Sequence, residues 1–194
     1  MLKTNTPDPT RGETRLIWKN TYDWTTNFFN EHPDLKVGVE IGIAGGQHIK
    51  ALMENTNIQK MYGVDPFITD SWDMHGFFSV DEEYGGFDGL YGEVKELLAQ
   101  FGDRVELVRK KSIEAAPDFE DGSLDFVFID AIHDYENCYN DIAHWHHRVR
   151  KGGYVMGHDW EHSEFPGVQK AVVEHYGDAV KGIPGPVHVW YVEV

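Results

Sequence analysis

Hydrophobic residues recur along the chain with two alternating periods, and this pattern predicts strands and helices in turn. Short apolar runs bounded by turn residues predict strands over residues 37–43, 60–64, 105–108, 124–129, 154–156 and 187–194. Apolar positions at helical spacing predict helices over residues 15–32, 49–55, 92–102, 136–150 and 165–176. Strands and helices therefore follow one another in almost strict alternation.

The order of these elements predicts the fold class. Strands that alternate with helices form α/β folds, in which a doubly wound, mostly parallel sheet carries helices on both faces. Residues 124–129, LDFVFI, are nearly all apolar, as expected for a central strand covered on both sides. We expect an antiparallel strand near the C-terminus. A length of 194 residues fits a single domain spanning residues 1–194.

Two segments lie outside this pattern. Residues 1–14 are rich in Thr, Pro and charge, and we interpret them as a loose N-terminal arm. Residues 68–91 combine glycines with aromatic residues and are long for an ordinary connection. We expect this second segment to form a lid or an acceptor-binding insertion.

Composition narrows the class of partner. The formal charge of −16 repels phosphate backbones and anionic membranes, so we expect neither nucleic acid nor a membrane as partner. The single cysteine, Cys138, excludes an internal disulfide, and the polar start lacks the pattern of a signal peptide. We therefore expect a cytoplasmic protein that binds a small molecule, and a homo-oligomer is compatible with the sequence.

A glycine-rich turn follows the first predicted strand. The segment Glu40, Ile41, Gly42, Ile43, Ala44, Gly45, Gly46 lies where that strand meets a helix, so backbone amides can approach a ligand closely. Asp65 ends the next strand, where a carboxylate can accept hydrogen bonds from ribose hydroxyls. Turn and carboxylate together predict a nucleoside ligand. Ala44 stands where the nicotinamide fingerprint needs its second glycine.

This turn resembles the first motif of the class I S-adenosylmethionine-dependent methyltransferases, whose fold is Rossmann-like. The motif is an acidic residue, an apolar residue and a glycine-rich turn, matched here by Glu40, Ile41, Gly42 and the Gly45-Gly46 pair. The resemblance implies that Glu40 and the turn bind the methionine part of S-adenosylmethionine and that Asp65 binds its ribose. VRKKSIEAAPDF, residues 108–119, resembles a later family segment and implies that Ser112 lies near the adenine.

A second resemblance covers residues 124–160. The run FIDAIHDYENCYNDIAHWHHRVRKGGYVMGHDW is similar to a pattern in a family that includes sugar and small-molecule O-methyltransferases. Arg148-Val149-Arg150 stands where that pattern has Leu-x-Pro. The resemblance implies methyl transfer to a hydroxyl of a sugar or natural product.

Two acidic residues define a candidate reaction centre. Asp130 and Asp159 each follow an apolar strand, so both carboxylates should emerge at the same edge of a parallel sheet, with Asp130 also beside the cofactor. Carboxylates suit Mg, Ca or Mn, and such a cation can lower the pKa of a substrate hydroxyl. His158 or His133 is a candidate third ligand, and the alternative role for His133 is that of a general base. The alternative for both aspartates is a purely structural role in helix capping.

Other functions stay open at this point. The cluster His144, His146 and His147 with Cys138 could indicate zinc, but these histidines do not share one helical face, so we interpret them as surface and packing residues. An NAD(P)-dependent oxidoreductase would use Asp65 but lacks the glycine spacing. A noncatalytic nucleoside-binding module would keep the pocket without the chemistry. The acceptor, and oxygen as against nitrogen, are not fixed by the sequence.

Overall fold

The computed structural model describes residues 12–68 and 84–194. Its helices are α1 (Gly12–Glu31), α2 (Gln47–Asn55), α4 (Phe87–Leu98), α5 (Ser112–Ala115), α6 (Tyr135–Trp145) and α7 (Pro166–Tyr176). Its strands are β1 (Val37–Ile41), β2 (Lys60–Val64), β3 (Val105–Val108), β4 (Leu124–Ile129), β5 (Val149–Gly157), β6 (Lys181–Ile183) and β7 (Val189–Glu193). Most of the predicted lid, residues 69–83, and the first eleven residues of the predicted arm lie outside the described residues.

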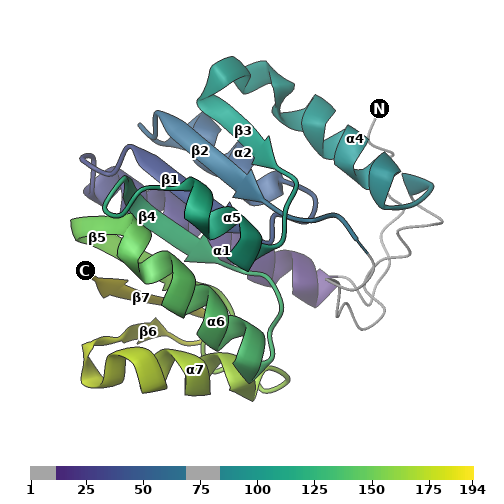
Figure 1. Ribbon diagram of the computed structural model, residues 1–194. Helices are drawn as coiled ribbons and strands as arrows, with labels where there is room; N and C mark the ends of the chain where they lie inside the picture. The colour runs from purple at the N-terminus through teal and green to yellow at the C-terminus, as the bar shows by residue number, and fades with distance from the viewer. Residues whose placement is uncertain (1–11, 69–83) are drawn as a thin grey trace.

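The strands form one sheet in the order β3-β2-β1-β4-β5-β7-β6 (Figure 1). β3, β2, β1, β4 and β5 pair in parallel, whereas β7 pairs antiparallel with both β5 and β6. The order reverses its direction at β1, and the adjoining strands β1 and β4 therefore flank the switch point where α/β sheets bind ligands. The predicted Rossmann-like α/β fold with an antiparallel C-terminal strand is confirmed.

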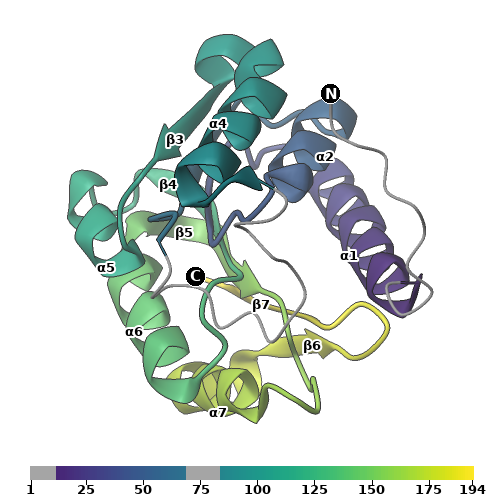
Figure 2. The same cartoon turned by 90° about the vertical axis from the view of Figure 1, so that its right-hand side faces the viewer.

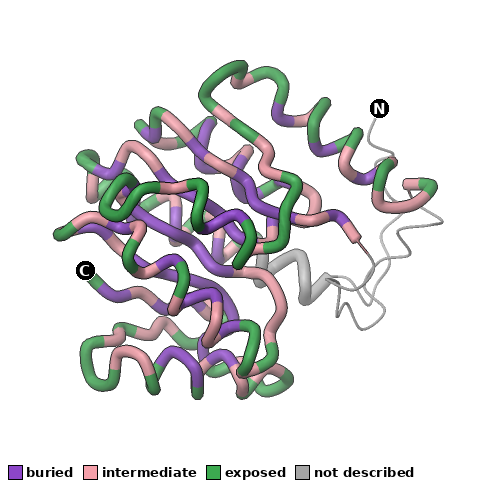
Figure 3. Tube along the Cα trace, viewed as in Figure 1, coloured by how far each residue is buried: buried purple, intermediate pink, exposed green. Residues whose placement is uncertain are grey.

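Helices cover both faces of the sheet, and the alternation of side chains along β4 shows why. Phe126 and Phe128 pack with buried residues of α1, α2 and α4, whereas Val127 and Ile129 pack with α5, α6 and α7. Figure 2 shows the sheet between these two helical layers, and Figure 3 shows its buried strands. Successive side chains of β4 therefore enter the two hydrophobic cores in alternation, one on each face of the sheet. A strand in this position needs an apolar residue at nearly every position.

The structure corrects several element boundaries. α1 begins at Gly12 rather than at residue 15, and helix α6 ends at Trp145 rather than at residue 150. Residues 149–153 instead extend β5, with a register irregularity opposite β4. Gly153 permits this path, because a Cβ there would lie 2.3 Å from the carbonyl oxygen of Asp125. The Gly-Gly pair that seemed to close a helix therefore belongs to a strand.

β6 is an additional short edge strand that the hydrophobic pattern did not predict. Within the described ranges, no helix combines the length and apolar character needed to cross a membrane.

Candidate functional site

The residues that follow four neighbouring strands lie in one row at the carboxyl edge of the sheet. Backbone hydrogen bonds extend the parallel pairing past each strand, from Asp65 N to Val108 O (3.2 Å), Gly42 N to Val64 O (2.9 Å), Asp130 N to Ile41 O (2.8 Å) and His158 N to Ile129 O (3.1 Å). The structure thus brings the predicted cofactor turn, Asp65 and the predicted reaction centre side by side.

The glycine-rich turn after β1 follows a path that its sequence makes possible. Gly42 and Gly46 adopt positive φ values of 81° and 71°, and Ala44 does so at 45°. Gly46 packs on α4, where a Cβ would meet Val94 at 3.1 Å. Gly45 differs, because a Cβ there would meet no heavy atom within 4 Å. The turn therefore leaves open space beside Gly45 while its other glycines are required by packing and backbone conformation.

Asp65 closes the same turn from the neighbouring strand. Its Oδ2 accepts a hydrogen bond from Ala44 N at 3.2 Å, and its Oδ1 accepts one from Phe67 N at 2.8 Å. Burial raises the pKa of Asp65, and these amide donors partly offset the increase. Each carboxylate oxygen has a second lone pair, so the side chain can accept further hydrogen bonds from a ligand.

Glu40 is buried at the end of β1, with 3% of its surface exposed. Its Oε1 lies 3.2 Å from Nδ1 of His48, at the start of α2, and Nε2 of His48 lies 2.9 Å from the hydroxyl of Thr25 on α1. Burial raises the pKa of Glu40, and His48 partly offsets this effect. Glu40 Oε2 has no hydrogen-bond partner among the described residues. Such a buried orphan acceptor is costly and calls for an explanation.

Three side chains converge at the predicted reaction centre. Asp130, His133 and Asp159 each offer an atom that could bind a metal, and these atoms all lie within 4.8 Å of one another. His133 Nε2 lies 3.0 Å from Asp159 Oδ2 and 3.5 Å from Asp130 Oδ1. Phe165 packs against the His133 ring, with centroids 4.4 Å apart. The compact set therefore contains His133 rather than His158, the two histidines between which the sequence left the third ligand open.

His158 supports this cluster from the side. Its Nδ1 lies 3.2 Å from Asp159 Oδ1 and 3.9 Å from Asp130 Oδ1. Its Nε2 lies 3.0 Å from the hydroxyl of Thr21, which itself donates to the carbonyl of Val187 at 2.9 Å. The Thr21 hydroxyl has only one hydrogen, so it accepts from Nε2 of His158. This arrangement fixes the orientation of the ring and holds Asp159 in place.

The electrostatics of the cluster follow from these contacts. Burial by itself would lower the pKa of His133, but the hydrogen bonds with Asp130 and Asp159 outweigh it and raise the pKa to about 10. Burial would raise the pKa of Asp159, but His158 and His133 outweigh it and hold that pKa below its ordinary range. Asp159 also has a φ of 61°, a strained conformation for a residue with a side chain.

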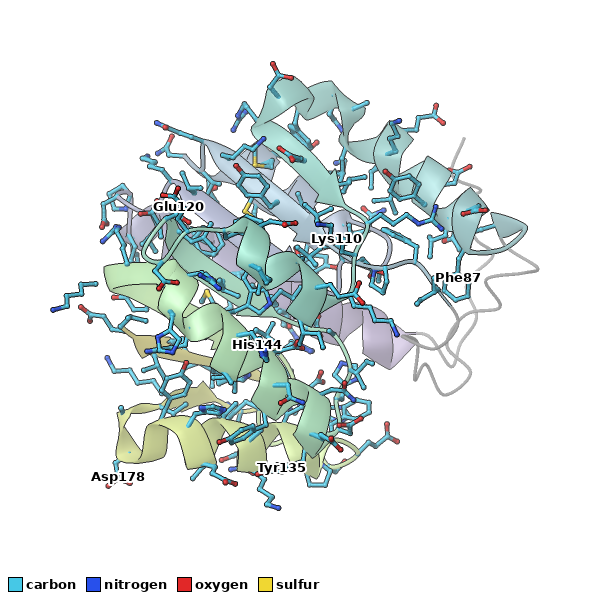
Figure 4. The ribbon with its side chains drawn as sticks, viewed as in Figure 1. Phe87, Lys110, Glu120, Tyr135, His144 and Asp178 are labelled. Atoms are coloured by element: carbon cyan, nitrogen blue, oxygen red, sulfur yellow. The ribbon has the colours of Figure 1, made fainter. Side chains whose placement is uncertain are left out.

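Other candidate residues occupy different surroundings. The Ser112 hydroxyl accepts a hydrogen bond from Trp145 Nε1 at 2.8 Å and contacts Asp141, so it is directed at α6. His144 lies on the outward side of α6 (Figure 4), whereas Cys138 on the same helix is buried. In residues 12–68 and 84–194, the only group with metal-ligand spacing is Asp130, His133 and Asp159. The interpretation as surface and packing residues therefore suits His144, His146, His147 and Cys138.

Four residues of the site escaped the sequence analysis. Thr21 and Thr25 are buried one helical turn apart on α1, Tyr22 lies between them, and His48 stacks on the Tyr22 ring with centroids 5.1 Å apart. The available signal was a pair of threonines at i and i+4 on the apolar side of a helix, where a hydroxyl needs a partner.

The comparisons with known proteins agree with this fold. A family model described as a methyltransferase domain matches residues 38–160, and the chain belongs to this family. Its resemblance to the class I S-adenosylmethionine-dependent methyltransferases is thereby confirmed.

Individual relatives are distant. An uncharacterized protein of Acanthamoeba polyphaga mimivirus is 26% identical over 148 residues, which cover 70% of this chain and 59% of that protein. A Methanococcus maripaludis protein, described as an S-adenosyl-L-methionine-dependent methyltransferase, has a TM-score of 0.65 at 11% identity, covering 100% of this chain and 97% of that one. The TDP-rhamnose 3′-O-methyltransferase of calicheamicin biosynthesis has a TM-score of 0.58 at 18% identity, covering 98% and 88%. At such identities, the solved structures establish the fold.

Proposed function

We propose that the protein transfers a methyl group from S-adenosylmethionine to a hydroxyl oxygen of a small-molecule acceptor, with a divalent cation bound at Asp130, His133 and Asp159. The observation that carries this proposal is the single row of residues at the sheet edge. There, a nucleoside-type turn adjoins a cluster of two carboxylates and an imidazole within 4.8 Å. Cofactor and acceptor can therefore meet at one edge.

The cofactor fits the chemistry of the residues present. Asp65 retains lone pairs for ribose hydroxyls. Glu40 Oε2 is a buried acceptor that lacks a partner in the described chain, and the α-ammonium group of a methionine moiety would supply one. The space beside Gly45 admits a ligand close to the backbone. In this proposal Asp65 would bind the ribose, Glu40 the amino group, and the space beside Gly45 would admit the chain that links them.

The divalent cation fits the other half of the site. Two carboxylates and one imidazole form a donor set that suits Mn²⁺ or another divalent metal, since histidine is more at home on transition metals than on Mg²⁺. When bound, such an ion lowers the pKa of a substrate hydroxyl and neutralises its developing charge. In this proposal His133 is a ligand, because its Nε2 lies 3.0 Å from Asp159 Oδ2 and 3.5 Å from Asp130 Oδ1 and so belongs to the compact donor set.

Side chains of the protein would orient the carboxylates and the two reactants. Thr21 fixes His158, and His158 holds Asp159 beside Asp130. In this proposal both carboxylates face the acceptor hydroxyl, and the proton of that hydroxyl leaves to solvent water. The acceptor oxygen forms a bond to the methyl carbon while the carbon–sulfur bond breaks, so the sulfonium becomes a neutral thioether. Orientation of these two reactants is the main contribution expected of the site.

A sugar or a similar hydroxylated natural product is our proposed acceptor class. The run from residue 128 to residue 160 is similar to a pattern of sugar and small-molecule O-methyltransferases, and one solved structure with this fold is a TDP-rhamnose 3′-O-methyltransferase. The formal charge of −16 disfavours strongly anionic acceptors away from a compensating cation.

The test is a methyl-transfer assay with a panel of free and nucleotide-linked sugars. S-adenosylhomocysteine formation is followed after chelation and after addition of Mn²⁺ or Mg²⁺. We expect turnover that requires the added ion and falls at least about 100-fold in Asp159→Asn, while the exposed control Asp178→Asn retains activity. Tight binding of S-adenosylhomocysteine without turnover of any acceptor would instead favour a noncatalytic nucleoside-binding module.

A further inference from the structure

The carboxylate of Glu40 is bound on one side only. Its Oε1 lies 3.2 Å from His48 Nδ1, and both side chains are 4% exposed. Its Oε2 is buried without a hydrogen-bond partner among the described residues. The two oxygens of one carboxylate therefore have different surroundings, and the difference is set by His48.

The hydrogen bonds of Thr25 determine which nitrogen of His48 carries a proton. The Thr25 hydroxyl donates to the backbone carbonyls of Thr21 at 2.9 Å and Tyr22 at 3.2 Å. That donation uses its single hydrogen, so its oxygen must accept from His48 Nε2, 2.9 Å away. His48 accordingly carries a proton on Nε2.

The other nitrogen of His48 then faces Glu40. Two lone pairs would repel across the 3.2 Å between Nδ1 and Oε1, so a second proton must lie between these atoms. Because that proton lies on the Oε1 side, Oε2 offers lone pairs only. It is an acceptor that requires a donor from outside the described chain.

The His48 ring is also held mechanically. The Tyr22 ring stacks on it with centroids 5.1 Å apart and an interplanar angle of 13°. Phe128 of β4 lies 4.7 Å from it by centroids. Stacked contacts and two hydrogen bonds together leave His48 little freedom to reorient, so the direction of Nδ1 is fixed before a ligand arrives.

We propose that His48, oriented by Thr25, is a positioning residue for Glu40: Nδ1 binds Oε1 and leaves Oε2 as the oxygen that accepts from the α-ammonium group of the cofactor. The inference rests on the proposed cofactor site and adds to it the elements that prepare Glu40. It assigns α1 and the first turn of α2 a part in cofactor recognition that the glycine-rich turn alone does not supply.

Two substitutions of His48 separate its nitrogens. The amide nitrogen of His48→Asn can take the place of Nδ1 and donate to Glu40, whereas the amide of His48→Gln reaches toward Thr25, at the place of Nε2. Binding is measured by calorimetry with S-adenosylhomocysteine and with 5′-methylthioadenosine, which lacks the amino acid portion. We expect His48→Gln to weaken S-adenosylhomocysteine about 10-fold and His48→Asn to retain most of the affinity. Neither variant should change methylthioadenosine binding.

If a His48 variant does not fold, Glu40→Gln tests the contact with the α-ammonium group that His48 is proposed to prepare. Its amide group would face the α-ammonium, so S-adenosylhomocysteine binding should weaken about 10-fold while methylthioadenosine binding is retained. Equal weakening of both ligands by His48→Gln, or wild-type affinity for S-adenosylhomocysteine in that variant, would overturn the positioning role and leave the cofactor site standing. Failure of the wild-type chain to bind either ligand would overturn both.

Discussion

The backbone of Gly42 lies directly against the carbonyl of Asp130, and a Cβ on Gly42 would be 2.2 Å from that oxygen. Asp130 N also donates to the carbonyl of Ile41 at 2.8 Å. The cofactor turn and the reaction centre are therefore joined through the backbone of adjacent strands. In the proposed reaction this contact would set the distance between the methyl donor and the acceptor.

Gly42→Ala tests this contact. A side chain at a φ of 81° and at 2.2 Å from backbone should destabilise the fold by about 2 kcal/mol or more, measured by urea unfolding. Gly45→Ala is the matched control, because its Cβ meets nothing within 4 Å. It should retain stability and lose affinity for S-adenosylhomocysteine. Unchanged affinity in Gly45→Ala would mean that the cofactor does not occupy this space.

Asp65→Asn tests the ribose contact. The amide keeps the size of the side chain but replaces one acceptor oxygen with a donor. The variant therefore loses a hydrogen bond from Ala44 N or Phe67 N, or one from the ribose. We expect calorimetry to show binding of both S-adenosylhomocysteine and methylthioadenosine weakened about 10-fold or more. Asp88→Asn, at an exposed ion pair with Arg109, is the control and should bind normally. Selective loss of S-adenosylhomocysteine alone would argue against a ribose contact.

A cation at the reaction centre should stabilise the folded protein. Mn²⁺ at about 100 times its dissociation constant stabilises by about 2.7 kcal/mol, which raises Tm by several degrees in a chain of this size. Thermal unfolding of the chelated protein with added Mn²⁺ should show this shift for the wild type and lose it in Asp130→Asn and Asp159→Asn. Asp178→Asn should respond like the wild type. An equal shift in all four proteins would place the ion elsewhere.

The sequence predicted the fold because its signals are local. The nearly continuous apolar run of 124–129 and the glycines after β1 each reflect their immediate surroundings, and the structure has a buried central strand and a tight turn there as expected. The Gly-Gly pair at 152–153 was misread because a helix end and an irregular strand use the same residue type, and only the contact with Asp125 distinguishes them.

The residues that support the site could not be predicted from patterns within short stretches of sequence. Thr25 contacts His48 across 23 positions, and Thr21 contacts His158 across 137. No periodicity links such pairs, since their meeting depends on how α1 packs against the carboxyl edge. The sequence did single out Asp130 and Asp159, because their place after apolar strands fixes the edge from which they emerge.

Asp141 gives the fold a pH dependence that is separate from the proposed cofactor and cation sites. This α6 side chain is 5% exposed, and burial raises its pKa from 3.8 to about 7, a rise that a hydrogen bond from Ser112 reduces only in part. Between these two values the unfolded chain has released the proton while the folded chain retains it. The contribution of Asp141 to stability is therefore lost as pH rises from about 4 to about 7, and does not change further above that range.

Asp141→Asn removes the titration and keeps the size of the side chain. Because one pKa unit corresponds to about 1.4 kcal/mol, the advantage of this variant over the wild type should grow with pH and approach about 4 kcal/mol at pH 8. Urea unfolding at pH 5, 6, 7 and 8 measures that difference, with the exposed Asp178→Asn as control. A difference that stays constant across this range would show that Asp141 is ionised in the folded protein at pH 5. The buried contact with Ser112 would then stabilise the carboxylate despite its burial, and Ser112→Ala should destabilise the fold more at pH 8 than below pH 4.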